Sequence, residues 1–231
     1  MILQRLPVLL HTDHLSPAVT SIYLDDGDFS LYHERISKEE GAQAIRIRYY
    51  GQEPSASEPV FIERKTHHEK WTGLESVKIR FSIKKKHVQA LLEGRCDVEK
   101  AFQKRAESAV LKGDEAALKE VEKAKQLAIE VQDTIKQRSL RPMIRTSYNR
   151  TAFQVPGDAR FRISLDTDLR IAKEGNDGTE QVGQRLKSED VCVFPYAVLE
   201  IKIQTHEGVE TPEWVTRLVE SELVRRHSTL T

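Results

Sequence analysis

Charged or polar residues spaced two apart recur along this sequence, and in most of these pairs an aliphatic or aromatic residue lies between the two members. In RIRYY, residues 46–50, the alternation of an extended strand would put Arg46 and Arg48 on one face and Ile47 and Tyr49 on the other. Two neighbouring guanidinium groups can bind phosphate oxygens through several hydrogen bonds. One such pair is also typical of the solvent face of an antiparallel sheet. A single pair therefore does not indicate a binding site, and the question is whether the pattern recurs.

Further segments carry the same pattern. Their same-face pairs are Glu63 and Lys65, Lys78 and Arg80, Tyr148 and Arg150, Arg160 and Arg162, and Glu200 and Lys202. If helices cover the apolar faces of these strands, the charged faces turn inward around a lumen. Charge is costly to bury unless it is paired or bound by a ligand. An ordinary solvated sheet is the open alternative.

The charges that would face such a lumen are mostly positive. Seven cations (Arg46, Arg48, Lys65, Lys78, Arg150, Arg162 and Lys202) are set against two carboxylates, Glu63 and Glu200. This excess calls for a polyanionic ligand, and a chain of phosphates fits it. The carboxylates have a role there if they hold a divalent cation that bridges to the same phosphates.

The elements that position these residues differ along the chain. Residues 17–83 alternate apolar and polar residues and are rich in Ile, Val, Tyr and Phe, which predicts strands. Residues 84–139 change to helix formers with apolar residues at helical spacing, which predicts about three helices, the last of them the longest. Residues 141–206 return to strands. This order favours an antiparallel α+β fold.

The composition excludes several classes of protein. The 231 residues contain 36 Lys plus Arg and 36 Asp plus Glu, so the net charge indicates no partner. The two cysteines, Cys96 and Cys192, lie far apart, which argues against a disulfide framework or a cysteine zinc site. No apolar run approaches the roughly 20 residues of a membrane span. The N-terminal MILQRLPVLL has no cleavage site of a secretory signal.

Several long stretches resemble one family nearly end to end. ERKTHHEKWTG and SYNRTAFQVPGDARFRISLDT are the most specific, and SIYLDD, LYHERISKEEGAQAIRIRYYG and FPYAVLEIKIQTHEGVETPEWV agree with them. Over about residues 7–222 the chain is similar to the central domain of the fungal vacuolar transporter chaperone subunits, a member of the triphosphate tunnel metalloenzyme superfamily. The resemblance implies an antiparallel β-barrel tunnel with covering helices, in which residues 84–139 are a helical insertion.

The resemblance also implies an activity and its surroundings. A catalytic subunit of this family transfers the terminal phosphate of ATP to a growing inorganic polyphosphate chain, with Mn²⁺ or else Mg²⁺ as the cofactor. The full proteins add regulatory and membrane-spanning domains and work with other subunits at the cytosolic face of the vacuolar membrane. Compared with them, residues 1–231 are expected to be a single tunnel domain without its first strand and its basic C-terminal segment. We expect it to be soluble by itself and weakly active.

The family's site residues carry over by position. Its phosphate-binding cations correspond to Arg46, Arg48, Lys65, Lys78, Arg150 and Arg162, while Tyr148, Lys202 and Glu200 correspond to a tunnel tyrosine, a tunnel lysine and the metal-binding glutamate. Glu63 is the second metal candidate. Arg80 and Arg160 are further candidates for substrate contacts, because alternation places them on the same charged faces.

Other interpretations stay open. The chain could be a non-catalytic subunit that binds polyphosphate, or a hydrolase of the same superfamily that uses water as the acceptor. Nucleic-acid binding is disfavoured, because the net charge is zero and no aromatic residues form a stacking platform. Asp166 and Asp168 fit a rim or a paired structural role, and Lys84–Lys86 fit a peripheral anion patch.

Overall fold

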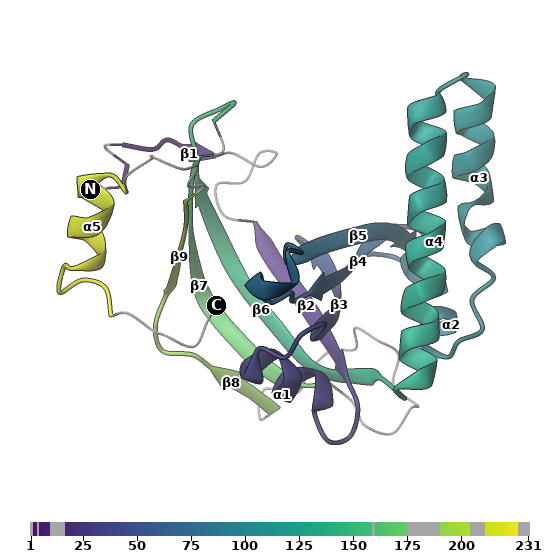
Figure 1. Ribbon diagram of the computed structural model, residues 1–231, viewed down its shortest axis with the longest axis horizontal. Coiled ribbons are helices and arrows are strands. Elements are labelled where there is room, and N and C mark those ends of the chain that lie inside the picture. Colours follow the sequence, from purple (N-terminus) through teal and green to yellow (C-terminus); the bar gives the residue numbers. More distant parts are fainter. Residues whose placement is uncertain are drawn as a thin grey trace. The chain divides into compact units, whose positions relative to one another are not determined.

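The structure is a computed structural model that describes residues 2–3, 5–9, 17–158, 160–174, 190–203 and 211–225. The chain divides into two units, and we describe each by itself. The terminal unit contains Met1–Val19, Ser147–Arg170 and Val193–Thr231, and the central unit contains Thr20–Thr146 and Ile171–Cys192. Figure 1 shows the elements along the chain.

Four strands of the first half of the chain follow the predicted alternation. They are β2 (Ala18–Asp25), β3 (Gln43–Tyr50), β4 (Pro59–Thr66) and β5 (Val77–Lys84). A helix that the alternation did not predict, α1 (Ser30–Ser37), lies between β2 and β3. The Asp25 carboxylate holds its first turn by accepting hydrogen bonds from the backbone N–H groups of Leu31 at 2.9 Å and Tyr32 at 3.0 Å.

The helical segment predicted for residues 84–139 is confirmed. It contains α2 (Val88–Leu92), α3 (Val98–Leu111) and α4 (Glu115–Gln137), and short 3₁₀ turns lie at η1 (Lys70–Thr72) and η2 (Lys85–His87). The carboxylates of Asp97 and Asp114 cap α3 and α4 by accepting from backbone N–H groups. As predicted, the last helix is the longest, and Figure 1 shows α3 and α4 as an antiparallel pair.

The helices cover one face of the central strands. Apolar residues of β3, β4 and β5 pack in one core with residues of all three helices; among them are Ile45, Ile47, Ile62, Phe81, Leu91, Phe102, Leu127 and Val131. Each fully buried side chain of this kind contributes about 1.5–3 kcal/mol. The opposite face of the same strands therefore carries most of their charged residues, the exception being Arg64 of β4, which pairs with Glu130 of α4 on the helix-covered face.

The second half of the chain returns to strands, as predicted. These are β6 (Arg141–Phe153), β7 (Phe161–Lys173), β8 (Val191–Val193) and β9 (Val198–Ile203), with the short β1 (Val8–Leu9) and the helix α5 (Glu213–Val219). A small apolar cluster in the terminal unit contains Leu6, Phe153 and Ile163, with Ile201 and Trp214 packed against it.

The described strands form a large sheet with the order β5-β4-β3-β2-β6-β7-β8, in which β1 pairs with β6 and β9 with β7. The pairings β1–β6, β3–β4, β4–β5 and β7–β9 are antiparallel. The predicted α+β class is confirmed. Among the described residues these pairings do not show the sheet closed into a barrel, so the closed tunnel stays a prediction.

Candidate functional site

The strand register of the central unit gathers the predicted cations of this unit on one face. Arg46 of β3 lies opposite Glu63 of β4, which lies opposite Arg80 of β5. One step along the same face, Lys65 lies opposite Lys78. Side chains alternate between the two faces of a strand, so this face is opposite to the one that the helices cover.

Glu63 is the centre of this charged face. Its side chain is fully buried, and its Oε2 lies 2.6 Å from Arg46 Nη2 and 3.6 Å from Arg48 Nη1. Its Oε1 lies 2.9 Å from Lys78 Nζ and 3.9 Å from Arg80 Nη1. Burial raises the pKa of Glu63, but the hydrogen bond from Lys78 and the charge of Arg46 outweigh it and lower this pKa to about 2. Four cations thus share one ionised carboxylate.

The two arginines of β3 are held by hydrogen bonds to side chains of the neighbouring strands β2 and β4. Arg46 donates from Nε and Nη2 to Glu63 and from Nη1 to the hydroxyl of Tyr23, at 2.9 Å. Arg48 donates from Nε to the hydroxyl of Ser21 at 3.0 Å. Only 11% and 8% of the two arginine side chains are exposed. Their orientation is therefore set by the protein and not by solvent.

The cations of β5 are more accessible than the arginines of β3. Lys78 and Arg80 have 41% and 52% of their side chains exposed, and Lys65 of β4 is also exposed. The Arg80 guanidinium lies 4.8 Å from the centre of the Phe61 ring, which steadies it by a cation–π contact. A polyanion that approaches this face meets Lys65, Lys78 and Arg80 before it meets the buried arginines.

The terminal unit holds a second charged cluster. In the β7–β9 register Arg162 lies opposite Lys202, and Ser164 lies opposite Glu200. Glu200 Oε1 lies 3.4 Å from Lys202 Nζ, and its Oε2 lies 4.0 Å from Arg150 Nη2. The residues predicted for this unit thus also come together on one face. The side chains of Glu200 and Lys202 are 46% and 63% exposed.

Sequence reasoning missed the main partner of Arg150. The carboxylate of Asp166 accepts from Arg150 Nε at 2.6 Å and from Nη2 at 2.7 Å. This bidentate pair raises the pKa of the Arg150 guanidinium. Of the two roles expected for Asp166, a rim residue or a paired structural residue, the structure shows the paired one. The signal in the sequence is its spacing from Arg162, four residues on along the same strand face.

The remaining two substrate candidates lie differently. The Arg150 guanidinium lies 5.1 Å from the centre of the Tyr148 ring, so Tyr148 belongs to the cluster around Arg150. Arg160 precedes the first residue of β7, is exposed, and pairs with Asp158 at 2.6 Å. Its predicted substrate contact remains a prediction, and its present partner is a carboxylate of the adjoining turn.

The surroundings of the two metal candidates differ in charge. A divalent cation 4 Å from one positive charge is repelled by about 8 kcal/mol at an effective dielectric constant of about 20. Glu63 has four cations within 4.0 Å of its oxygens, so it is a poor metal ligand. Glu200 lies beside two cations, of which Arg150 is already neutralised by Asp166.

Glu200 is therefore better suited than Glu63 to bind a metal ion that is also bound by the substrate phosphates. Within the described ranges no group of three or more His, Cys, Asp or Glu residues is placed to hold a metal ion. One carboxylate suffices where substrate phosphates and water supply the other oxygens, which is the usual arrangement for Mg²⁺. The residues present fit a metal that enters with its phosphate ligand.

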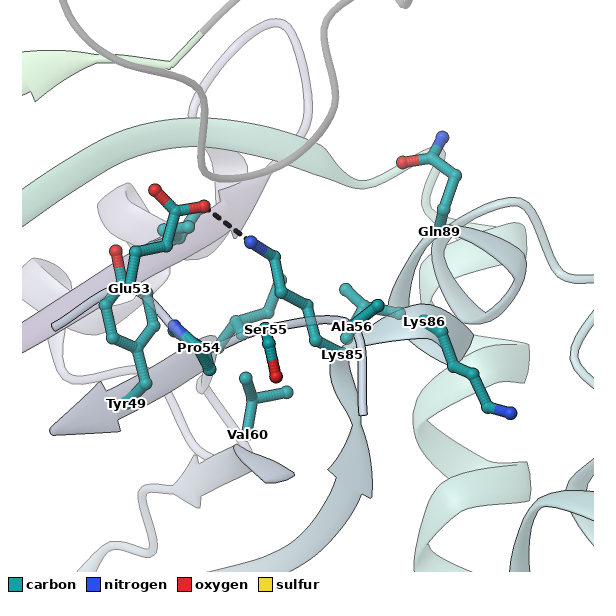
Figure 2. A pocket seen from close by; sticks show the side chains of 12 residues that line it. Tyr49, Glu53, Pro54, Ser55, Ala56, Val60, Lys85, Lys86 and Gln89 are labelled. Carbon is teal, nitrogen blue, oxygen red and sulfur yellow. Dashed lines mark hydrogen bonds and ion pairs between the residues drawn. The ribbon is translucent and has the colours of Figure 1, made fainter. Parts of the chain in front are cut away.

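A pocket of about 470 Å³ lies elsewhere in the central unit. Ile47 and Val60 contribute to its lining, and Ile47 alternates with Arg46 and Arg48 along β3, so the pocket is not on the charged face. Figure 2 shows Lys85 at this pocket reaching the carboxylate of Glu53. This lysine of the predicted peripheral anion patch is thus paired with an acid.

Comparisons with known proteins give the family of this chain. The VTC domain family matches residues 1–230, and the chain belongs to this family. It is 45% identical to vacuolar transporter chaperone complex subunit 4 of Schizosaccharomyces pombe, over 96% of this chain and 32% of that protein. The resemblance found in the sequence is confirmed.

Two further relatives show how the similarity is distributed. Subunit 4 of the same complex from Trypanosoma cruzi is 36% identical over 89% of this chain and 26% of that protein. Subunit 2 from Schizosaccharomyces pombe is 28% identical over 91% of this chain and 29% of that protein. The chain thus spans between a quarter and a third of the length of these relatives. No helix among the described residues is long and apolar enough to cross a membrane.

Proposed function

We propose that this chain is the polyphosphate polymerase domain of a vacuolar transporter chaperone subunit. It would transfer the terminal phosphate of ATP to a growing inorganic polyphosphate chain. The observation that carries the proposal is the charged face of the central unit, where Arg46, Arg48, Lys78 and Arg80 share the single carboxylate of Glu63. So many cations with one counter-charge are suited to a ligand with several negative charges.

Phosphoryl transfer needs little covalent chemistry from the protein. The reacting phosphate has to be aligned with the acceptor, and the charge on its oxygens has to be neutralised. We assign the phosphate oxygens to the cations carried over from the family, which are Arg46, Arg48, Lys65, Lys78, Arg150, Arg162 and Lys202. The buried arginines are held in place before the substrate arrives, which lowers the cost of organising the site.

The metal is assigned to Glu200. Mn²⁺, or Mg²⁺ in its place, would supply positive charge to the phosphate oxygens when bound. Glu200 would hold it from one side, while Asp166 keeps the Arg150 guanidinium oriented. We also propose that the sheet closes into the tunnel of the triphosphate tunnel metalloenzymes, with the charged faces inward, as the resemblance implies.

The similarity of this chain is greater to subunit 4 than to subunit 2 of the complex. The chain is 45% identical to subunit 4 of fission yeast and 36% identical to subunit 4 of a trypanosome. It is only 28% identical to subunit 2 of fission yeast. It therefore follows one subunit type across distant organisms. By the same similarity we propose that it works with other subunits of the complex, at the cytosolic face of the vacuolar membrane.

The proposal is tested by incubating residues 1–231 with ATP and Mn²⁺ and separating the products by gel electrophoresis. In keeping with the weak activity expected of residues 1–231, a slowly formed ladder of long polyphosphate is expected from the unmodified chain, and the same ladder from Lys119→Gln, an exposed substitution on α4. Glu200→Gln should not form the ladder. Release of free phosphate alone would favour the hydrolase, and binding of polyphosphate without consumption of ATP would favour the non-catalytic subunit.

A further inference from the structure

Glu63 is the most enclosed of the three carboxylates described in the two charged clusters. Its side chain has no exposed surface, whereas those of Asp166 and Glu200 are 11% and 46% exposed. Arg46 binds it from β3 through two nitrogens, and Lys78 binds it from β5 at 2.9 Å. The carboxylate is therefore not open to a ligand from solvent, and any effect it has on a phosphate acts through these cations.

The cations around Glu63 divide into two layers. Arg46 and Arg48 are almost fully buried and are also held by Tyr23 and Ser21. The outer cations, Lys78 and Arg80, are about half exposed. A phosphate chain that lies on this face competes with Glu63 for Lys78 and Arg80. Each of these two cations is attracted by the carboxylate on one side and by the phosphates on the other.

We propose that Glu63 is a positioning residue that weakens the hold of the charged face on polyphosphate. It would fix the buried arginines and take up part of the positive charge of the outer cations. This inference rests on the proposed function, because a polymerase must let its product advance after each transfer. A face with the same cations and no counter-charge would bind the chain tightly and release it slowly.

The test is the affinity of residues 1–231 for tripolyphosphate, measured by calorimetry at two salt concentrations. Glu63→Gln keeps the shape of the side chain and removes its charge, so tripolyphosphate should bind at least about tenfold more tightly, which is about 1.4 kcal/mol. Its affinity should also fall more steeply with salt. Glu63→Asp keeps the charge, and its affinity should stay within about threefold of the unmodified chain.

Glu130→Gln is the matched control. Glu130 of α4 accepts from Arg64 Nη2 at 2.9 Å, and Arg64 adjoins Glu63 in β4 with its side chain on the helix-covered face. This variant removes the same charge from the same unit, on the opposite face of the sheet. Its tripolyphosphate affinity should be unchanged. An equal gain in both variants would mean that total charge, and not the position of Glu63, sets the affinity.

Other outcomes separate this inference from the proposed function. If Glu63→Gln binds tripolyphosphate as the unmodified chain does, or more weakly, the inference is overturned while the function stands. If the unmodified chain does not bind tripolyphosphate, the proposed function itself fails. If Glu63→Gln is unfolded alone, tripolyphosphate should refold it, as seen by far-UV circular dichroism, and a chain that stays unfolded would contradict us. In polymer synthesis this variant should lower KM and kcat together, which loss of structure alone would not do.

Discussion

Glu63 should make the stability of the central unit depend on pH in an acidic range. The pKa of its carboxyl is about 2 in the folded chain, against 4.5 for an ordinary glutamate. Between these two values the unfolded chain binds a proton that the folded chain does not bind. The free energy of unfolding should therefore fall as the pH falls from about 4.5 toward 2, and the contribution of Glu63 should be complete above that range.

The size of the effect follows from the shift. Each pKa unit corresponds to about 1.4 kcal/mol, so lowering the pKa from 4.5 to about 2 stabilises the folded state by about 3 kcal/mol. The Glu63 side chain has no exposed surface, so solvent does not screen this interaction as it does for surface pairs. Breaking a buried ion pair by removing one partner costs a similar amount, about 3–5 kcal/mol.

Urea unfolding between pH 2 and pH 6, followed by far-UV circular dichroism, measures this contribution. Glu63→Gln should be less stable than the unmodified chain at pH 6, and the difference should shrink by about 3 kcal/mol as the pH approaches 2. Glu53→Gln is the control. The Glu53 side chain pairs with Lys85 and is 43% exposed, so its substitution should change the free energy of unfolding by at most about 1 kcal/mol. Parallel curves for Glu63→Gln and the unmodified chain would refute the reasoning.

Three further predictions concern the two charged clusters. Asp166→Asn leaves the partly buried guanidinium of Arg150 without its bidentate partner and should lower the free energy of unfolding by about 2 kcal/mol; an unchanged urea midpoint would contradict it. Glu200→Gln should reduce polymer synthesis at least about a hundredfold, or about 3 kcal/mol, and should leave tripolyphosphate binding intact, so near-normal synthesis would remove its role. The double variant Lys78→Met and Arg80→Gln should bind tripolyphosphate at least about tenfold more weakly in its folded state, and its melting temperature should also fall, because Lys78 pairs with the buried carboxylate of Glu63 at 2.9 Å. Equal affinity in calorimetry would show that these cations do not contact phosphate.

The faces of the strands could be predicted from the sequence because alternation is a property of every extended strand. The placement of Arg46, Lys78 and Arg80 on one face required only their spacing, and the antiparallel register brought them together. The helical segment was equally predictable, since its apolar residues recur at helical spacing over more than fifty residues. The short helix α1 was missed because eight residues give little periodicity.

The division of the cations into buried and accessible ones could not be read from the sequence. Arg46 and Arg80 have the same residue type and the same strand spacing, but Arg46 is held by Tyr23 and Glu63, and Arg80 lies over Phe61 in the edge strand of the described sheet order. Strand order and neighbours decide this, and spacing within one strand does not report them. For the same reason the sequence did not distinguish Glu63, surrounded by cations, from the more open Glu200.

The charged face of the central unit is expected to be the surface that binds a phosphate chain. Lysine acetylation with and without polyphosphate, read by mass spectrometry, measures this directly. Polyphosphate should protect Lys65 and Lys78 strongly and leave Lys119 of α4 unchanged. Protection of Lys84–Lys86 in place of Lys65 and Lys78, or equal protection of Lys119, would contradict the assignment of the charged face as the binding site.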